Sequence, residues 1–211
     1  MADFLELNKM VATGKSKAVK ELVTAAIEEG IAPKDILEKG LLPGMSEIGE
    51  KFKNNEVYVP EVLIAARAMN AGTALLKPLM AAGDVVAPGT AVIGTVKGDL
   101  HDIGKNLVAL MVESAGFEVI DLGVDVTPEK FAETAKNEGC NLVCCSALLT
   151  TTMPVMEKVV VALKEAGVRE QVTVLVGGAP VTQEFCDQIG ADIYTADGAS
   201  AANKAAAILT A

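Results

Sequence analysis

The only histidine among the 211 residues of this chain lies in a short segment rich in carboxylates. His101 follows Asp99 by two positions, and Asp102 and Gly104 complete the segment. Residues two apart in an extended loop point the same way, so the Asp99 carboxylate can face the His101 ring. A carboxylate on one imidazole nitrogen fixes the tautomer and leaves the other nitrogen free for a metal ion. The spacing therefore makes His101 the first candidate for metal ligation or for proton transfer near neutral pH.

Two other segments could complete a site with His101. The run from Ser146 to Thr152 is rich in hydroxyl groups, and the pair Gly177-Gly178 leaves the backbone without side chains. Each feature also has a purely structural interpretation. His101 could cap the helix that follows it, the threonines could cap the next helix, and the two glycines could form a simple turn. The residues alone leave both interpretations open.

The elements that must position these segments are those of an α/β domain. Strand-like apolar runs alternate with helical patterns after residue 88, and the predicted strands cover 91–96, 118–122, 142–146, 173–176 and 192–194. The runs are apolar throughout, which is typical of a parallel sheet covered on both faces. We therefore expect a flavodoxin-like, doubly wound sheet of five parallel strands. Its binding crevice would lie at the carboxyl ends of the strands, where all three segments occur.

The first part of the chain predicts a helical domain. Apolar residues recur at helical spacing in residues 3–12, 15–29, 33–40, 45–53 and 60–80, with a break at Leu42-Pro43-Gly44. Four or five helices with short connections favour an antiparallel bundle. A linker at about residues 81–88 separates the two predicted domains, a helical cap at residues 1–87 and an α/β domain at residues 88–211.

Composition and charge argue against several classes of function. The formal net charge is −10, which disfavours binding to nucleic acid. The sequence has no run of about 20 uninterrupted apolar residues, so no membrane span is predicted. The first residues lack the pattern of a signal peptide. We therefore expect a cytoplasmic protein. The four cysteines show no C-x-x-C spacing and predict buried, reduced thiols rather than a zinc site.

Together, the three segments resemble the family of cobalamin-binding domains. Their residues are similar to the family pattern D-x-H-x-x-G, S-x-L and G-G, in that order: Asp99-Leu100-His101-Asp102-Ile103-Gly104, Ser146-Ala147-Leu148 and Gly177-Gly178. The helical part resembles the cap that precedes this domain in cobalamin-dependent methionine synthase and in small corrinoid methyl carriers. That resemblance is carried by Pro43-Gly44-Met45, Gly49-Glu50-Lys51-Phe52 and Tyr58-Val59-Pro60-Glu61.

The resemblance implies a role for each matched residue. His101 would be the lower axial ligand of cobalt, Asp99 would hold its other ring nitrogen, and Thr152 would complete a relay. Methionine synthase has Ser where this chain has Thr152, so the extra methyl group could alter the geometry of the relay. The channel for the displaced nucleotide tail would be formed by Gly104, Ser146, Leu148, Thr150, Gly177 and Gly178. Further cofactor contacts would come from Leu100, Asp102, Ile103 and Ala199, and from Tyr58, Val59 and Leu63 above the cobalt.

The resemblance also implies a function. Cobalamin or a related corrinoid would carry a methyl group on cobalt between two partner enzymes. The first, a substrate:corrinoid methyltransferase, would act on a methoxylated aromatic, a methylamine, a betaine or methanol. The second, a methylcorrinoid methyltransferase, would pass the group to tetrahydrofolate or coenzyme M, and a reductive activase would be a third partner. This chain would be a component of that system rather than an enzyme on its own.

Three alternatives stay open at the level of sequence. One is a cobalamin-dependent sensor or regulatory protein, which would be expected to add an output domain. Another is the small subunit of an adenosylcobalamin-dependent mutase, although a mutase subunit would not explain the helical cap. The third is a flavodoxin-like interaction module without a cofactor, in which His101 would be incidental.

Overall fold

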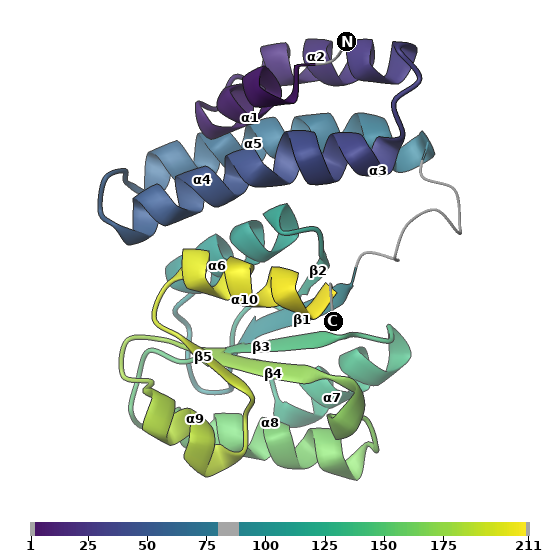
Figure 1. Ribbon diagram of the computed structural model, residues 1–211. Coiled ribbons are helices and arrows are strands. Elements are labelled where there is room, and N and C mark those ends of the chain that lie inside the picture. Colours follow the sequence, from purple (N-terminus) through teal and green to yellow (C-terminus); the bar gives the residue numbers. More distant parts are fainter. Residues whose placement is uncertain (1–2, 80–88, 210–211) are drawn as a thin grey trace. The chain divides into compact units, whose positions relative to one another are not determined.

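The computed structural model describes residues 3–79 and 89–209. The described residues form two compact units, one made of the helices that precede residue 80 and one made of strands and helices that follow residue 88 (Figure 1). Apolar side chains are buried within each unit. The predicted linker and the predicted boundary between residues 87 and 88 lie outside the described residues.

The first unit is helical, as predicted. Its α-helices are α1 (Phe4–Ala12), α2 (Ser16–Glu28), α3 (Pro33–Asp35), α4 (Leu42–Lys53) and α5 (Val59–Leu76). A π-helical segment, η1 (Ile36–Leu41), lies between α3 and α4, and a 3₁₀ turn, η2 (Lys77–Leu79), follows α5. Helix α1 packs on α4, and α2 packs on α5. The buried apolar side chains of this unit are aliphatic or methionine, so the scarcity of aromatic residues in the sequence does not prevent a closed core.

The predicted helix break at Leu42-Pro43-Gly44 is wrong. Segment η1 leads straight into α4, whose first turn contains Pro43. Proline is common in the first turn of an α-helix because its fixed φ matches the helical backbone. Gly44 serves helix packing, since a Cβ at this position would lie 2.4 Å from the backbone oxygen of Asn8 in α1. The two residues that suggested a break thus begin one helix and allow close approach of another.

The second unit is a parallel sheet with helices on both faces, which confirms the predicted fold class (Figure 1). The strands are β1 (Thr90–Thr95), β2 (Glu118–Asp121), β3 (Leu142–Ser146), β4 (Thr173–Gly177) and β5 (Ile193–Thr195), in the order β2-β1-β3-β4-β5. Helices α6 (Ile103–Ser114) and α10 (Gly198–Leu209) cover one face. Helices α7 (Pro128–Asn137), α8 (Pro154–Glu165) and α9 (Gln183–Ile189) cover the other, and a 3₁₀ turn, η3 (Arg169–Gln171), precedes β4.

Alternate residues of each strand face opposite sets of helices. In β3, Cys144 belongs to the core beneath α6 and α10, whereas Cys145 belongs to the core beneath α7, α8 and α9. Because both faces are covered, the strands are apolar throughout, as the sequence pattern indicated. All four cysteines are free and buried, as predicted. Burial raises the pKa of the Cys144 thiol to about 12.

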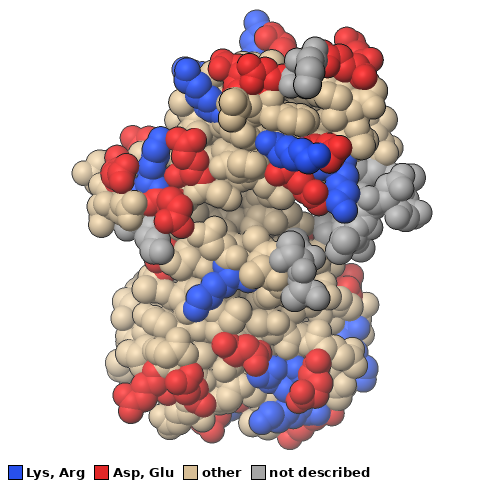
Figure 2. All heavy atoms as spheres, in the orientation of Figure 1, with Lys and Arg blue, Asp and Glu red and all other residues tan. Residues whose placement is uncertain are grey.

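Charged side chains of both signs lie next to one another on the face shown in Figure 2. Pairs spaced by four residues on exposed helix faces include Lys34 with Glu38 and Lys39 with Asp35. Exposed pairs of this kind contribute only about 0–1 kcal/mol each. Within residues 3–79 and 89–209, no helix has both the length and the apolar character that crossing a membrane requires.

The register of the sheet brings the three motif-bearing loops together. Thr95 at the end of β1 pairs with Ser146 of β3, and Ser146 pairs with Gly177 of β4. The loops that follow these strands therefore start side by side, as predicted for the carboxyl edge of a parallel sheet. Gly178, the first residue after β4, has a φ of 136°, and a Cβ there would lie 1.9 Å from the backbone oxygen of Ala147.

This contact predicts a large difference between two glycine substitutions. Gly178→Ala should destabilise the protein by roughly 3 kcal/mol, because the backbone must shift to relieve the overlap with Ala147. Gly190→Ala is the matched control, since Gly190 also has a positive φ, of 72°, but a Cβ there would meet no atom within 4 Å. Its expected cost is only about 1 kcal/mol for the left-handed backbone. Urea unfolding of the two variants checks the difference, and equal costs would contradict it.

Candidate functional site

Asp99 is fully buried although it lies on a loop. Its Oδ1 accepts the backbone N–H of His101 at 3.2 Å and lies 2.9 Å from Nδ1 of the same residue. Its Oδ2 accepts the backbone N–H groups of Leu148 and Leu149, at 2.7 and 3.2 Å, and lies 2.9 Å from the hydroxyl of Thr152. The loops after β1 and β3 therefore meet at a single carboxylate.

These hydrogen bonds decide the charge of Asp99. Burial raises the pKa of the Asp99 carboxyl, but the hydrogen bonds from Leu148, His101 and Thr152 together lower it further than burial raises it. The net pKa lies well below the ordinary value of 3.8. The stability that this ionised group contributes is therefore present above pH 3.8 and is lost only as the pH falls through the lower, folded-state value. At neutral pH Asp99 can only accept, so Nδ1 of His101 must carry the proton that they share.

The remainder of the His101 ring is accessible. Its side chain is 56% exposed, although Nδ1 is occupied by Asp99. When Nδ1 of a neutral imidazole carries the proton, Nε2 has a free lone pair. Imidazoles that bind metal ions have this arrangement, with a carboxylate on the nitrogen that does not bind the metal.

Thr152 occupies the position predicted for the third group of the relay. Its hydroxyl oxygen lies 2.9 Å from Asp99 Oδ2 and 2.9 Å from the backbone oxygen of Leu149. The hydroxyl has one proton and can donate to only one of these oxygens at a time. The methyl group of Thr152 lies on the side of Gly98, at 3.5 Å from where a Cβ of that glycine would be. The structure thus accommodates the methyl group without moving the hydroxyl away from Asp99.

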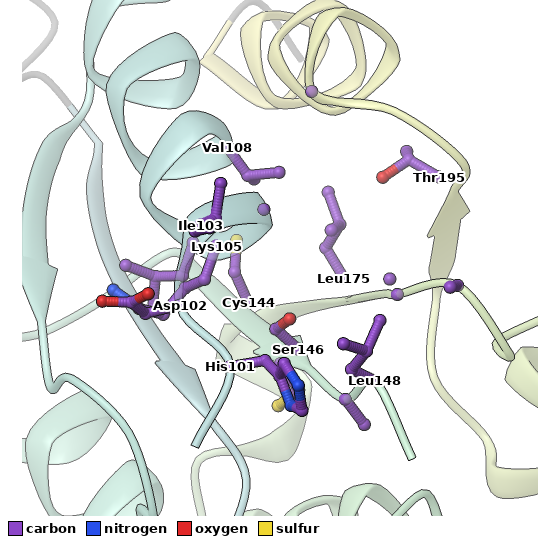
Figure 3. Close-up of a pocket in the computed structure, with 18 of the residues that line it drawn as sticks. His101, Asp102, Ile103, Lys105, Val108, Cys144, Ser146, Leu148, Leu175 and Thr195 are labelled. Carbon is purple, nitrogen blue, oxygen red and sulfur yellow. The ribbon is translucent and has the colours of Figure 1, made fainter. Parts of the chain in front are cut away.

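A cavity of about 510 Å³ opens beside His101, between the sheet and helices α6 and α10. Figure 3 shows Ser146 and Leu148 beside His101, with Val108, Leu175 and Thr195 farther along the cavity. This volume is in the usual range for sites that hold small molecules. The other lining residues are Ile93, Leu100, Asp102, Ile103, Gly104, Lys105, Cys144, Cys145, Ala147, Gly177, Gly178, Ala179, Ala196, Asp197 and Gly198.

Two of the predicted cofactor-binding residues, Thr150 of the predicted channel and Ala199, lie away from the cavity. Thr150 is exposed in the turn after β3, because the chain bends there and returns Thr152, not Thr150, to Asp99. Ala199 is buried in the first turn of α10 and does not line the cavity, although its neighbours Asp197 and Gly198 do. The other residues predicted in this unit either line the cavity or bind Asp99.

Two glycines of the cavity wall leave space that a side chain would take. A Cβ at Gly104, in the first turn of α6, would meet no atom within 4 Å. Gly177 stands in the sheet between Ser146 and Thr195, and a Cβ there would lie 3.1 Å from the backbone oxygen of Thr195. Glycine at these positions keeps the entrance and one wall of the cavity open.

Several residues that line the cavity were not expected from the sequence, although the periodicity of the strands indicates them. Cys144 and Leu175 are register partners, and each precedes a motif residue of the same strand by two positions. Since residues two apart on a strand face the same side, the row that holds Ser146 and Gly177 continues inward through these two residues. The sequence does not show the register between strands, which places Cys144 beside Leu175.

The three residues of the first unit that were predicted to lie above the cobalt are among its exposed apolar residues. Tyr58, which precedes α5, is 71% exposed, and Val59 and Leu63 in α5 are 39% and 43% exposed. Val59 and Leu63 are four residues apart and therefore lie on one face of the helix. Exposed apolar side chains gathered in this way often mark a contact surface for a ligand or a partner. Their role above a cobalt ion stays a prediction.

Comparisons with known proteins match both units. The family model described as a B12 binding domain matches residues 89–206, and a second model with the same description matches residues 5–77. Trimethylamine corrinoid protein 1 of Methanosarcina acetivorans is 45% identical over 191 residues, covering 90% of this chain and 88% of the relative. The dimethylamine corrinoid protein of Methanosarcina barkeri is 44% identical over 208 residues, covering 97% of this chain and 98% of the relative.

Solved structures extend this likeness to the arrangement of the backbone. A cobalamin-binding protein from Desulfitobacterium hafniense has a TM-score of 0.84 at 29% identity, covering 99% of both chains. The methanol:cobalamin methyltransferase complex of Methanosarcina barkeri contains a chain with a TM-score of 0.81 at 32% identity, covering 97% of this chain and 78% of that one. The loop motifs, the buried carboxylate behind His101 and both family models therefore agree, and the chain belongs to the family of B12-binding proteins.

Proposed function

We propose that this chain is a corrinoid methyl carrier that serves the demethylation of a methylated amine. Relatives named trimethylamine and dimethylamine corrinoid proteins are 43–48% identical to it over most of their length. This similarity supports methylamines among the donors that the sequence left open. A methyltransferase specific for the amine, a second methyltransferase for tetrahydrofolate or coenzyme M, and a reductive activase belong to the proposal.

The residues of the second unit fit a corrinoid. The observation that carries the proposal is the exposed His101 ring, held at Nδ1 by a buried, ionised Asp99 at the mouth of a cavity. His101 would ligate the cobalt through Nε2, and the cavity would hold the nucleotide tail, with Ser146 and Leu148 at its entrance. When bound, the corrinoid supplies a cobalt ion that can accept a methyl group and release it.

The protein's own contribution would be to bind the corrinoid, to orient the His101 ring and to shield the cobalt from water. Asp99 holds the His101 ring in one orientation and keeps the lone pair on Nε2, and Thr152 restrains the carboxylate. An imidazole exposed to solvent can exchange its proton with water whenever Nε2 is not ligated. Tyr58 and Leu63 would exclude water from the opposite side of the corrinoid, where a methyl group on cobalt must be protected.

Replacing His101 tests the ligation directly. The wild-type protein, reconstituted with hydroxocobalamin, should show the visible spectrum of cobalt with a nitrogen axial ligand. His101→Ala should still bind the corrinoid through the cavity, with a spectrum that lacks this ligand. Because the chain has one histidine, no other imidazole of the protein can substitute. Failure of the wild type to bind would overturn the proposal, and identical spectra would overturn the role of His101.

Gly104→Leu should separate folding from cofactor binding. The apoprotein should be as stable as the wild type or more stable by up to about 1 kcal/mol, because leucine is the better helix former and the space is open. Uptake of hydroxocobalamin should fall at least about tenfold, since a leucine at the cavity entrance would overlap the tail and cost more than about 1.4 kcal/mol of binding. Titration by absorbance measures the uptake, and unchanged affinity would contradict this use of the cavity.

The donor class can be tested with the reconstituted holoprotein. Amine-specific methyltransferases, supplied with trimethylamine or dimethylamine, should methylate the reduced corrinoid on this chain. A methanol-specific methyltransferase is the matched comparison and should react at least about a hundredfold more slowly, a difference of roughly 2.7 kcal/mol in partner recognition. Absorbance of the methylated corrinoid reports the transfer. Preference for methanol would replace the amine in the proposal without removing the carrier function.

A further inference from the structure

The loop that carries His101 has no regular secondary structure, so its backbone must be held by other segments. It connects β1 to α6 through residues 96–102. The hydroxyl of Thr95, fully buried at the end of β1, donates to the backbone oxygen of His101 at 2.7 Å. The N–H of Asp99 donates to the backbone oxygen of Val96 at 3.1 Å, which closes a turn within the loop. Both anchors belong to β1 or to the loop itself.

A separate anchor comes from the loop between β2 and α7. The backbone N–H of Asp125 donates to the backbone oxygen of Asp99 at 3.1 Å. The carboxylate of Asp125 accepts the N–H of Gly98 at 2.7 Å. One residue, 27 positions along the chain from Gly98, thus binds two consecutive residues of the His101 loop, one through its backbone and one through its side chain.

The segment around Asp125 is itself tied to the end of β1. Thr95 donates its N–H to the backbone oxygen of Gly123 at 2.9 Å, and Val126 donates to the backbone oxygen of Thr95 at 2.9 Å. Val126 also forms an isolated parallel bridge with Val96. Asp125 therefore lies in a segment fixed on both sides, and its contacts restrain the loop rather than following it.

Asp125 has a backbone conformation that favours glycine over residues with a side chain. Its φ is 56°, in the left-handed region that residues with a Cβ seldom adopt. Glycine would take this conformation without strain, and the backbone contact to Asp99 would be kept. Only the carboxylate contact to Gly98 requires the aspartate. Asparagine tolerates the same conformation and keeps an oxygen acceptor, which supplies a matched control.

We propose that Asp125 is a positioning residue for His101, holding Gly98 and Asp99 so that the Asp99 carboxylate meets Nδ1 of the ring. The inference rests on the proposed role of His101 at a corrinoid and adds a residue from outside the three motifs. Asp125 acts through Asp99 and touches neither the ring nor the cofactor cavity.

The test uses the tautomer of His101 in the apoprotein. The single histidine of the chain can be labelled with ¹⁵N, and two-dimensional NMR at a pH where the imidazole is neutral shows which ring nitrogen carries the proton. The wild type and Asp125→Asn should hold the proton on Nδ1. Asp125→Gly should lower the ratio of the Nδ1–H form to the Nε2–H form about fivefold, the effect of losing one hydrogen bond of ordinary strength.

Asp125→Ala separates positioning from stability. It loses the carboxylate as the glycine variant does, but it also keeps a Cβ in the left-handed backbone, so it should be the less stable of the two. The tautomer ratio should be the same in both variants, whereas the urea midpoint should differ. A tautomer ratio that follows stability, or one that stays unchanged in the glycine variant, would overturn the proposal. Unfolding of both variants would also overturn it, because Asp125 would then be needed for the fold.

Reconstitution with hydroxocobalamin distinguishes this inference from the proposed function. If the wild type and Asp125→Asn show nitrogen ligation and Asp125→Gly shows less of it, both stand. If all the variants ligate equally and have the same tautomer ratio in the apoprotein, the proposed function stands and the positioning role fails. If no variant binds the corrinoid but the tautomer shifts in the glycine variant, the positioning role stands and the proposed function fails.

Discussion

A carboxylate removed from water must be compensated by hydrogen bonds, and the loops at one edge of the sheet are arranged around this requirement at Asp99. The donors come from two different loops, since His101 follows β1 whereas Leu148, Leu149 and Thr152 follow β3. Neither loop can move away without leaving a buried charge short of partners, and such a loss costs several kcal/mol. The position of the exposed imidazole is therefore determined by a group that solvent does not reach.

At the same edge of the sheet, a buried ion pair lies next to the open cavity. Lys105 is also buried, where its ammonium group binds Asp121 at 2.5 Å and Asn106 at 2.6 Å, and so ties the first turn of α6 to the end of β2. Beside these fixed groups, Gly104 and Gly177 contribute no side chain to the cavity wall. A polar framework thus surrounds a space that the chain itself does not fill, which is the usual character of a pre-formed ligand site.

Much of this arrangement could be predicted from the sequence because it depends on short-range rules. The parallel sheet followed from apolar runs that alternate with helical patterns, and the contact between Asp99 and His101 followed from their spacing. The rest depends on contacts between distant segments. The sequence could not show that Pro43 starts a helix, that the turn after β3 exposes Thr150, or that Asp125 has a positive φ. Each of these three local conformations depends on contacts with a segment that is distant in the sequence.

The burial of Cys144 has a chemical consequence for the cavity that it helps to line. With its pKa raised to about 12, the thiol stays protonated at neutral pH, and only the thiolate is a strong nucleophile or a good metal ligand. The sulfur atom can therefore line the cavity without acting as a nucleophile and without competing with the His101 imidazole as a metal ligand. The packing that closes the core of the sheet also makes this wall of the cavity chemically inert.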